Sequence, residues 1–268
     1  MANLALEAAA SGLSSLNTRL DVIANNLANV NTIGFKQSRA NFEDLLYVER
    51  SRPGTQNASG DEKPTGLYVG LGVRVSGTQV NFAQGTAIEG SPTDMMIDGN
   101  GFFMVEVEPG KGGDGVAYTR AGNFLRNPDG ELVLANSQGR RLIPNITIPV
   151  NAKDISISSN GIVSYIEDGA TAPTEVGPIE IAVFANPEGL KQAGENLFIE
   201  TAGSGAATVG QPGTESFGSI IGGRYEASNV DPTRELIEMI RTQRAFEMNS
   251  QSIRAADQAL QTVAQLRS

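Results

Sequence analysis

Residues 6–30 read LEAAASGLSSLNTRLDVIANNLANV. Their apolar residues recur at alternating steps of three and four, and no proline interrupts them. This heptad spacing places them on one face of a helix, and such a face packs against a partner helix. The sequence therefore predicts a long amphipathic helix near the N-terminus. Its apolar seam consists of Leu13, Leu16, Leu20, Ile23, Leu27 and Val30, preceded by Leu6 and Ala9.

A second long helix is predicted over residues 231–268. Asp231 and Pro232 are typical of a helix start, because aspartate caps the first turn and proline suits the first helical position. No glycine or further proline follows, and a seam again advances by threes and fours. The apolar seam residues are Met239, Phe246, Ile253, Leu260 and Val263, with Thr242, Asn249 and Ala256 between them.

Residues 73–225 have a different sequence pattern, with short apolar or alternating runs bounded by turn residues. Turns are indicated at Pro128-Asp129-Gly130 and at Ser159-Asn160-Gly161. Short strands spaced in this way predict an all-β domain. The expected fold class is thus α+β, with long terminal helices forming a coiled-coil-like core around an inserted all-β domain.

Residues 31–72 form the third predicted region. It begins with Phe35, Phe42, Leu46 and Tyr47, and then becomes polar over residues 50–65, as is typical of an extended or flexible segment. We therefore assign residues 1–30 and 231–268 to a helical core, residues 31–72 with 226–230 to an extended stretch, and residues 73–225 to a β-rich domain.

The composition lowers the probability of several function classes. The 268 residues include no cysteine and no histidine, which removes the commonest general base and the soft metal ligands. A net charge of −10 argues against binding to nucleic acid, which needs clustered basic residues. No run is long and apolar enough for a membrane span, and residues 1–12 lack the basic flank of a secretory signal. We expect no cofactor and no metal.

The sequence pattern alone is compatible with two arrangements of the helices. The helices can form an intramolecular stalk, or copies of the chain can pack side by side and bury the remaining apolar surface. Four asparagines, Asn25, Asn26, Asn29 and Asn31, crowd the end of the first helix. Their amides can satisfy neighbouring backbone groups in an interface or can simply face water.

Two long motifs resemble signatures of the flagellar axial proteins, the rod and hook family. They are VIANNLANVNTIGFK at residues 22–36 and SNVDPTRELIEMIRTQRAFEMNSQSIRAADQALQ at residues 228–261. Residues 97–103 and 118–124 resemble the family's central β domain, so the resemblance covers nearly the whole chain. Within the family the chain is most similar to the distal rod subfamily, and the alternatives are a proximal rod protein or a hook-type protein.

The resemblance implies a helical homo-oligomer that forms a hollow, rigid drive shaft across the periplasm in the flagellar basal body. It implies export through the flagellar type III apparatus, and contacts with proximal rod proteins, the hook protein and the L- and P-ring proteins. The seam residues are expected to hold the assembly. Inter-subunit motif residues would be Asn25, Asn26, Asn29, Gly34, Phe35, Gln243, Arg244 and Asn249. A stiffening stretch would include Phe42, Leu46, Tyr47, Pro53 and Gly54.

Other classes remain as weaker hypotheses. A carboxylate pair of a secreted glycan hydrolase could be drawn from Asp94, Asp98, Asp129 and Glu131. Asp98 and Asp129 each precede a glycine, however, and are typical of turns. Residues 110–115, GKGGDG, lack the ending of a phosphate-binding loop. A surface adhesin with a helical stalk is the third possibility. The sequence therefore predicts a structural protein and not an enzyme.

Overall fold

A computed structural model of the chain describes residues 2–55, 64–108, 110–111, 115–168, 172–214 and 216–265. The chain folds as two compact units. The helical unit comprises Met1–Ala28, Ser38–Gln79 and Asp231–Ser268, and the β unit comprises Asn29–Gln37 and Val80–Val230. The described residues contain long helices and many strands in small sheets, which confirms the α+β class.

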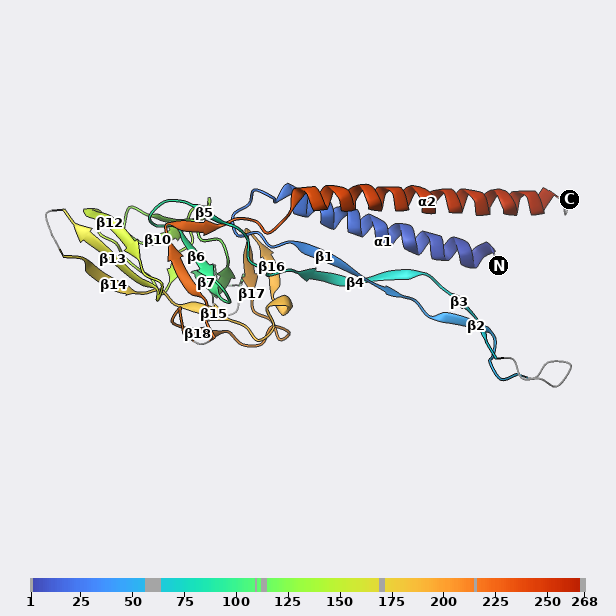
Figure 1. Cartoon of the computed structure of the whole chain (residues 1–268), viewed down its shortest axis with the longest axis horizontal. Helices are drawn as coiled ribbons and strands as arrows, with labels where there is room; N and C mark the ends of the chain where they lie inside the picture. Colours follow the sequence, from blue (N-terminus) through green and yellow to red (C-terminus); the bar gives the residue numbers. More distant parts are fainter. Residues whose placement is uncertain are drawn as a thin grey trace. The chain divides into compact units, whose positions relative to one another are not determined.

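The helical unit contains α1 (Ala2–Ala28) and α2 (Pro232–Gln265). Helix α1 ends two residues before Val30, where Thr32 donates backbone and side-chain hydrogen bonds to Asn29 and closes a turn. Helix α2 begins as expected, because the Asp231 carboxylate accepts the backbone N–H groups of Thr233 and Arg234 at 2.9 and 3.2 Å. Figure 1 shows the two helices lying side by side and running in opposite directions.

The helical unit also contains two antiparallel strand pairs from the stretch between α1 and the β unit. Strand β1 (Ser38–Asp44) pairs with β4 (Val73–Val80), and β2 (Tyr47–Ser51) pairs with β3 (Leu67–Gly70). The predicted stretch ended at residue 72, but in the structure the corresponding segment of the helical unit extends to Gln79. Gly72 lies flush against α1, because an added Cβ would clash with the Ser11 hydroxyl. Residues 56–63 of the expected flexible segment lie outside the described residues.

The β unit is built from short strands in several small sheets. Among the described residues, the largest sheet has the order β16-β17-β8-β7-β15-β18, with β11 also paired to β7, and a second has the order β12-β13-β14. The β unit also contains three two-stranded sheets, formed by β9 with β10, β6 with β19 and β5 with β20. The strand bounds are β5 Ala87–Glu89, β6 Met95–Asp98, β7 Phe102–Glu106, β8 Val116–Thr119, β9 Phe124–Arg126, β10 Leu132–Leu134 and β11 Leu142–Ile143. They continue with β12 Ala152–Ile157, β13 Ile162–Glu167, β14 Thr174–Pro178, β15 Ile181–Val183, β16 Lys191–Gly194, β17 Leu197–Ile199, β18 Thr208–Gly210, β19 Ser219–Gly222 and β20 Arg224–Glu226, with a 3-10 turn at Pro187–Gly189.

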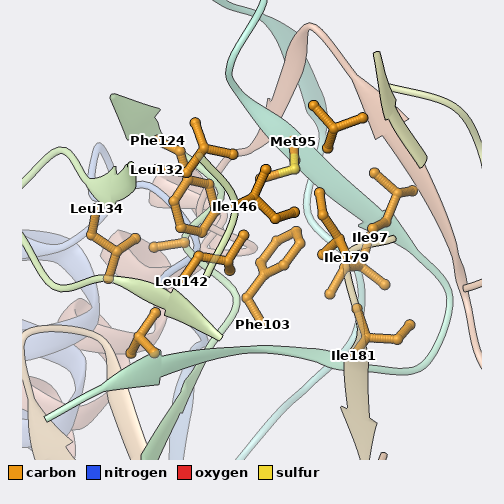
Figure 2. Close-up of a cluster of buried hydrophobic side chains, with 14 of the residues drawn as sticks. Met95, Ile97, Phe103, Phe124, Leu132, Leu134, Leu142, Ile146, Ile179 and Ile181 are labelled. Atoms are coloured by element: carbon orange, nitrogen blue, oxygen red, sulfur yellow. The ribbon is translucent and has the colours of Figure 1, made fainter. Parts of the chain in front are cut away.

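The main core of the β unit lies on one face of β7, as Figure 2 shows. Phe103 is fully buried there and meets Phe124 edge to face, with 5.4 Å between the ring centroids. Because side chains alternate along a strand, Phe102 points to the other face, where it joins a smaller aromatic cluster with Phe82, Phe184 and Phe198. Strand β7 is therefore covered on both faces, as its uninterrupted apolar sequence indicates.

A charged corner of the β unit joins the turn before β10 to the segment after β11. The Glu131 carboxylate accepts hydrogen bonds from Asn145 Nδ2 at 2.7 Å and Asn127 Nδ2 at 2.9 Å, and Arg141 Nε lies 2.9 Å away. These hydrogen bonds, followed by the charge of Arg141, hold the pKa of Glu131 below its ordinary value of 4.5. The carboxylate therefore favours the folded state when it is ionised.

We expect acid to weaken the β unit partly through Glu131. Since the folded pKa is the lower one, the contribution is complete above about pH 4.5 and is lost as the pH falls through the folded value. Glu131→Gln should flatten the loss of unfolding free energy below about pH 4.5, measured by urea melts at several pH values. Glu108→Gln is the matched control, because the Glu108 side chain is 69% exposed. Parallel pH profiles for the wild-type and Glu131→Gln chains would contradict this account.

Candidate assembly interface

The inner seam of the helical unit lies where α1 and α2 face each other. Ile23 is its most buried apolar residue, at 5% exposed, and Ser15, Asn26, Glu235 and Thr242 are also buried. The predicted seam residues Leu13, Leu16, Leu20, Leu27, Met239, Phe246 and Ile253 are half-buried, whereas Leu260 is 37% exposed. Val30 lies beyond α1, in the β unit, and the side chain of Val263 is outside the described residues.

Polar side chains fix the register of the two helices. Asn249 Nδ2 donates to the Ala9 carbonyl at 2.9 Å, and Arg19 pairs with Glu238 at 2.6 Å. Gly12 leaves the space for Asn249, since a Cβ on Gly12 would stand 2.6 Å from the Asn249 amide nitrogen. An amide that bonds backbone across an interface favours one register, because any shift leaves a buried polar group unpaired.

The asparagines at the end of α1 differ in position. The Asn26 amide exchanges two hydrogen bonds with the Ser38 backbone, at 2.8 and 2.9 Å, and its Nδ2 lies 3.3 Å from the Glu235 carboxylate. Asn25 is exposed, and Asn29 belongs to the β unit. Asn26 therefore joins α1, α2 and the start of β1, all within the helical unit.

A second apolar face lies on the outside of α2. Leu236, Ile237, Ile240 and Met248 are 46–62% exposed. At 3.6 residues per turn, Ile237 and Met248 project from the side opposite to Phe246. Leu236 and Ile240 lie on the flank of the helix between those two sides. Isolated exposed apolar residues are ordinary, but a group of them on one helix face marks an interaction surface. We call these four residues the outer face.

The strand pairs of the helical unit present further apolar groups. Leu46, Tyr47, Val48, Leu67 and Tyr68 are all exposed, with Leu46 at 81%. Tyr47 covers Gly70 on the paired strand, and its hydrogen bond with Asp44 raises the pKa of the phenol. An apolar cleft of about 390 Å³ lies where Leu4, Ala5 and Ala8 of α1 face Leu67 and Val69 of β3. Phe42, Pro53 and Gly54 are also exposed, and so are Gln243 and Arg244 on α2.

The motif residues Gly34 and Phe35 lie in the β unit, beside a buried charged group that sequence reasoning missed. Lys36 Nζ is 2.6 Å from Glu226 Oε1, and the Arg120 guanidinium lies 3.7 Å from Glu226 Oε2. We call Lys36, Arg120 and Glu226 the junction cluster. Burial lowers the pKa of Lys36, with the Glu226 carboxylate opposing that effect, and burial likewise lowers the pKa of Arg120. Lys36 ends the first motif and Arg120 lies in residues 118–124, but Glu226 stands two residues before the second motif, so no pattern in the sequence joins the three.

The described residues give little support for a catalytic or metal-binding site. Asp98 and Asp129 are exposed residues next to glycines with positive φ, as expected of turns. No group of three or more carboxylates that could hold a metal ion occurs among the described residues. Within the same residues, neither helix is long and apolar enough to cross a membrane.

Paired helices that leave an apolar outer face uncovered, on a chain with a separate β unit, define a structural subunit of an assembly. Three family models match the chain at the corresponding places. They describe a flagella basal body rod protein at residues 6–36, a flagellar hook protein FlgE/F/G D1 domain at residues 96–165, and a flagellar basal body rod FlgEFG protein C-terminal region at residues 221–266.

Curated relatives give the particular family. The flagellar basal-body rod protein FlgG of Caulobacter vibrioides is 46% identical over 98% of this chain and 99% of its own length. The FlgG protein of Borreliella burgdorferi is 44% identical over 96% of both chains. The FlgF rod protein of Caulobacter vibrioides is more distant, at 33% identity over 87% of this chain and 85% of its own. The chain belongs to the FlgG family of flagellar basal-body rod proteins. It is a structural subunit of the flagellar rod and not an enzyme.

Proposed function

We propose that copies of this chain polymerise helically into the hollow, rigid distal rod that transmits motor torque to the hook. The uncovered outer face of α2 carries this proposal. One apolar seam of α2 is used against α1, and Leu236, Ile237 and Ile240 need a different partner. In a family of rod proteins, that partner is a second copy of the same chain.

We assign different roles to the parts of the chain. The terminal helices form a coiled-coil-like inner tube, with the predicted seam residues that lie within α1 and α2, together with Asn249, holding the two helices against each other. The stretch after α1, including Phe42, Leu46, Tyr47, Pro53 and Gly54, packs against neighbouring copies and stiffens the shaft. The exposed aromatic and aliphatic side chains of β2 and β3 support that role. The β unit forms the outer surface.

The polar part of α2 fits the channel of such a tube. Beyond Ile240, the outward side of α2 continues with exposed residues at steps of three and four. Most of these residues carry uncharged amides, which stay hydrated. An unfolded protein passing through the channel would therefore meet little apolar surface. These residues are Gln243, Glu247, Gln251, Arg254, Gln258, Gln261 and Gln265.

The neighbours and the location follow from the same proposal. We place the polymer in the periplasm, where it would join proximal rod proteins at one end and the hook protein at the other, inside the L- and P-rings. Its subunits would reach that place through the flagellar type III export apparatus. The distal position is favoured over the proximal one because the FlgG protein of Caulobacter vibrioides is more similar than the FlgF protein of the same organism.

We expect Ile240→Asp to block polymerisation while leaving the free subunit folded. Ile240 is 51% exposed in the single chain, so a carboxylate there costs little until another copy covers it. Electron microscopy of purified basal bodies should show rods that stop before the distal segment. Melting of the soluble variant should match the wild type.

Gln251→Asp is the matched control, because it places the same charge about three turns further along the exposed polar side of α2, which the proposal assigns to the hydrated channel. It should assemble normally. Full-length rods in the Ile240→Asp strain would contradict the proposed packing, and so would a soluble variant that is already unfolded.

A further inference from the structure

The chain passes between the helical unit and the β unit at four places in its described part, after residues 28, 37, 79 and 230. We propose that the junction cluster forms in the free subunit and ties all four of these connections together, so that the end of α1 and the start of α2 are set before subunits assemble. This goes beyond polymerisation, because it concerns a single chain before it meets another copy.

The first support is the geometry of one carboxylate. Glu226 Oε1 accepts a hydrogen bond from Lys36 Nζ at 2.6 Å and another from the Gly85 backbone N–H at 2.7 Å. The same Lys36 Nζ donates to the Ala83 carbonyl at 2.9 Å. Lys36 and Glu226 are both fully buried, so these bonds are shielded from water. Three segments far apart in the sequence therefore meet at one buried ion pair.

A neutral layer of hydrogen bonds joins the same segments. The Asn229 amide accepts the Gln37 N–H at 2.8 Å and donates to the carbonyls of Asn81 and Ala83 at 2.8 and 2.9 Å. The Gly34 N–H donates to the Glu226 carbonyl at 2.8 Å. All of these partners belong to the β unit, so none of the bonds requires α1 or α2 to be folded.

The junction cluster can affect both helices because each of them lies only a few residues along the chain from a segment that the cluster holds. Helix α1 ends at Ala28, six residues before Gly34, and α2 begins at Pro232, three residues after Asn229. An isolated helix has a large entropic cost of nucleation and pairing. Holding both helix ends by short tethers turns their pairing into a local event, and it limits the registers that the pair can sample.

Hydrogen exchange on the soluble full-length chain tests the proposal without any polymer. We expect the amides of Gly34, Gln37 and Gly85 to be protected as strongly as those of β7 and β8, while amides of α1 and α2 exchange at least about tenfold faster. Residues 33–37 that exchange as fast as α1 would overturn the proposal. The result does not depend on rod assembly, so it separates this inference from the proposed function.

Substitutions then test whether the charges hold the connections. Arg120 is buried beside Glu226, so Lys36→Met leaves one cation facing one carboxylate, whereas Glu226→Gln leaves two buried cations facing none. We expect Glu226→Gln to speed exchange in residues 33–37, 81–85 and 226–229 together, by at least about tenfold, and Lys36→Met to do so less. Strands β12, β13 and β14 should keep their protection, which would show that the variant still folds.

Lys153→Met is the matched control, because Lys153 forms an ion pair of 2.8 Å with Asp168 at the surface. It should leave exchange in all three segments unchanged. Loss of protection in only one of the segments of the Glu226→Gln chain would show that the cluster does not tie them together. Equal effects of the Glu226→Gln and Lys153→Met substitutions would overturn the role of the charges.

Discussion

Ile23→Asp should abolish rod assembly while leaving the β unit folded. Ile23 is 5% exposed on α1, on the side that faces α2, so the substitution removes a buried branched side chain and places a carboxylate in the same space. Loss of the side chain alone costs about 2–5 kcal/mol, and an unpaired buried charge adds to that. Because the described part of the helix pair has few other fully buried apolar residues, we expect the pairing to fail.

The measurement has two parts. Microscopy of purified basal bodies should show no distal rod, and a urea melt of the soluble chain should retain the transition of the β unit. Ala24→Asp is the matched control, because Ala24 is the next residue on α1 and is exposed. It should assemble. Leu20→Asp and Ile253→Asp, at half-buried positions of the same seam, should give intermediate defects.

If Ile23→Asp still built distal rods, the α1–α2 seam would not be what holds the helical unit. The outcome differs from that expected for Ile240→Asp, which keeps the helix pair and removes only its contact with another copy. The two variants together therefore distinguish folding of the subunit from its polymerisation.

Gly34→Val should strongly destabilise the β unit. Gly34 has a φ of +70°, and an added Cβ would stand 2.5 Å from the Ala121 nitrogen and 2.6 Å from the Arg120 carbonyl carbon. These are backbone atoms, which cannot rotate away as a side chain can. We expect a loss of more than about 3 kcal/mol, from left-handed strain together with the steric clash. For a unit of this size, that corresponds to a melting temperature lower by roughly 6 °C or more.

Gly223→Val isolates the clash from the backbone strain. Gly223 has nearly the same φ, +72°, and lies in the same β unit, but its added Cβ would meet nothing within 4 Å. It should lose only about 1–2 kcal/mol, the cost of a left-handed conformation for a residue with a side chain. Calorimetry of both variants would compare them directly. Equal melting temperatures would mean that Gly34 does not pack against Ala121.

Much of the helical unit could be predicted from the sequence, because helix signals are local. The three-and-four spacing around Ile23 predicted α1, and Asp231-Pro232 predicted the start of α2 at the residue where it occurs. The end of α1 was less well predicted, since the helix stops at Ala28, two residues before the predicted seam ends at Val30, and Asn29 and Thr32 close a turn there. The family resemblance is confirmed by relatives that cover nearly the whole chain.

The strand pairs after α1 were not apparent in the sequence. Strands β1 and β4 are far apart along the chain, and neither has a clean alternation of apolar and polar side chains. Pairing of this kind depends on which distant segment is available. The roles of the seam, motif and stretch residues in contacts between copies remain predictions, which the variants above are designed to test.

Local sequence patterns by themselves determined the two terminal helices, the β character of the middle and, through two long motifs, the family. Periodicity can determine these features because each depends on residues within a few turns or one strand. Only the tertiary structure decided which face of α2 packs on α1 and which stays exposed. It also decided that Lys36 meets Glu226, 190 residues away, inside the β unit. Such a contact depends on how the whole chain folds back on itself, and no local pattern records it.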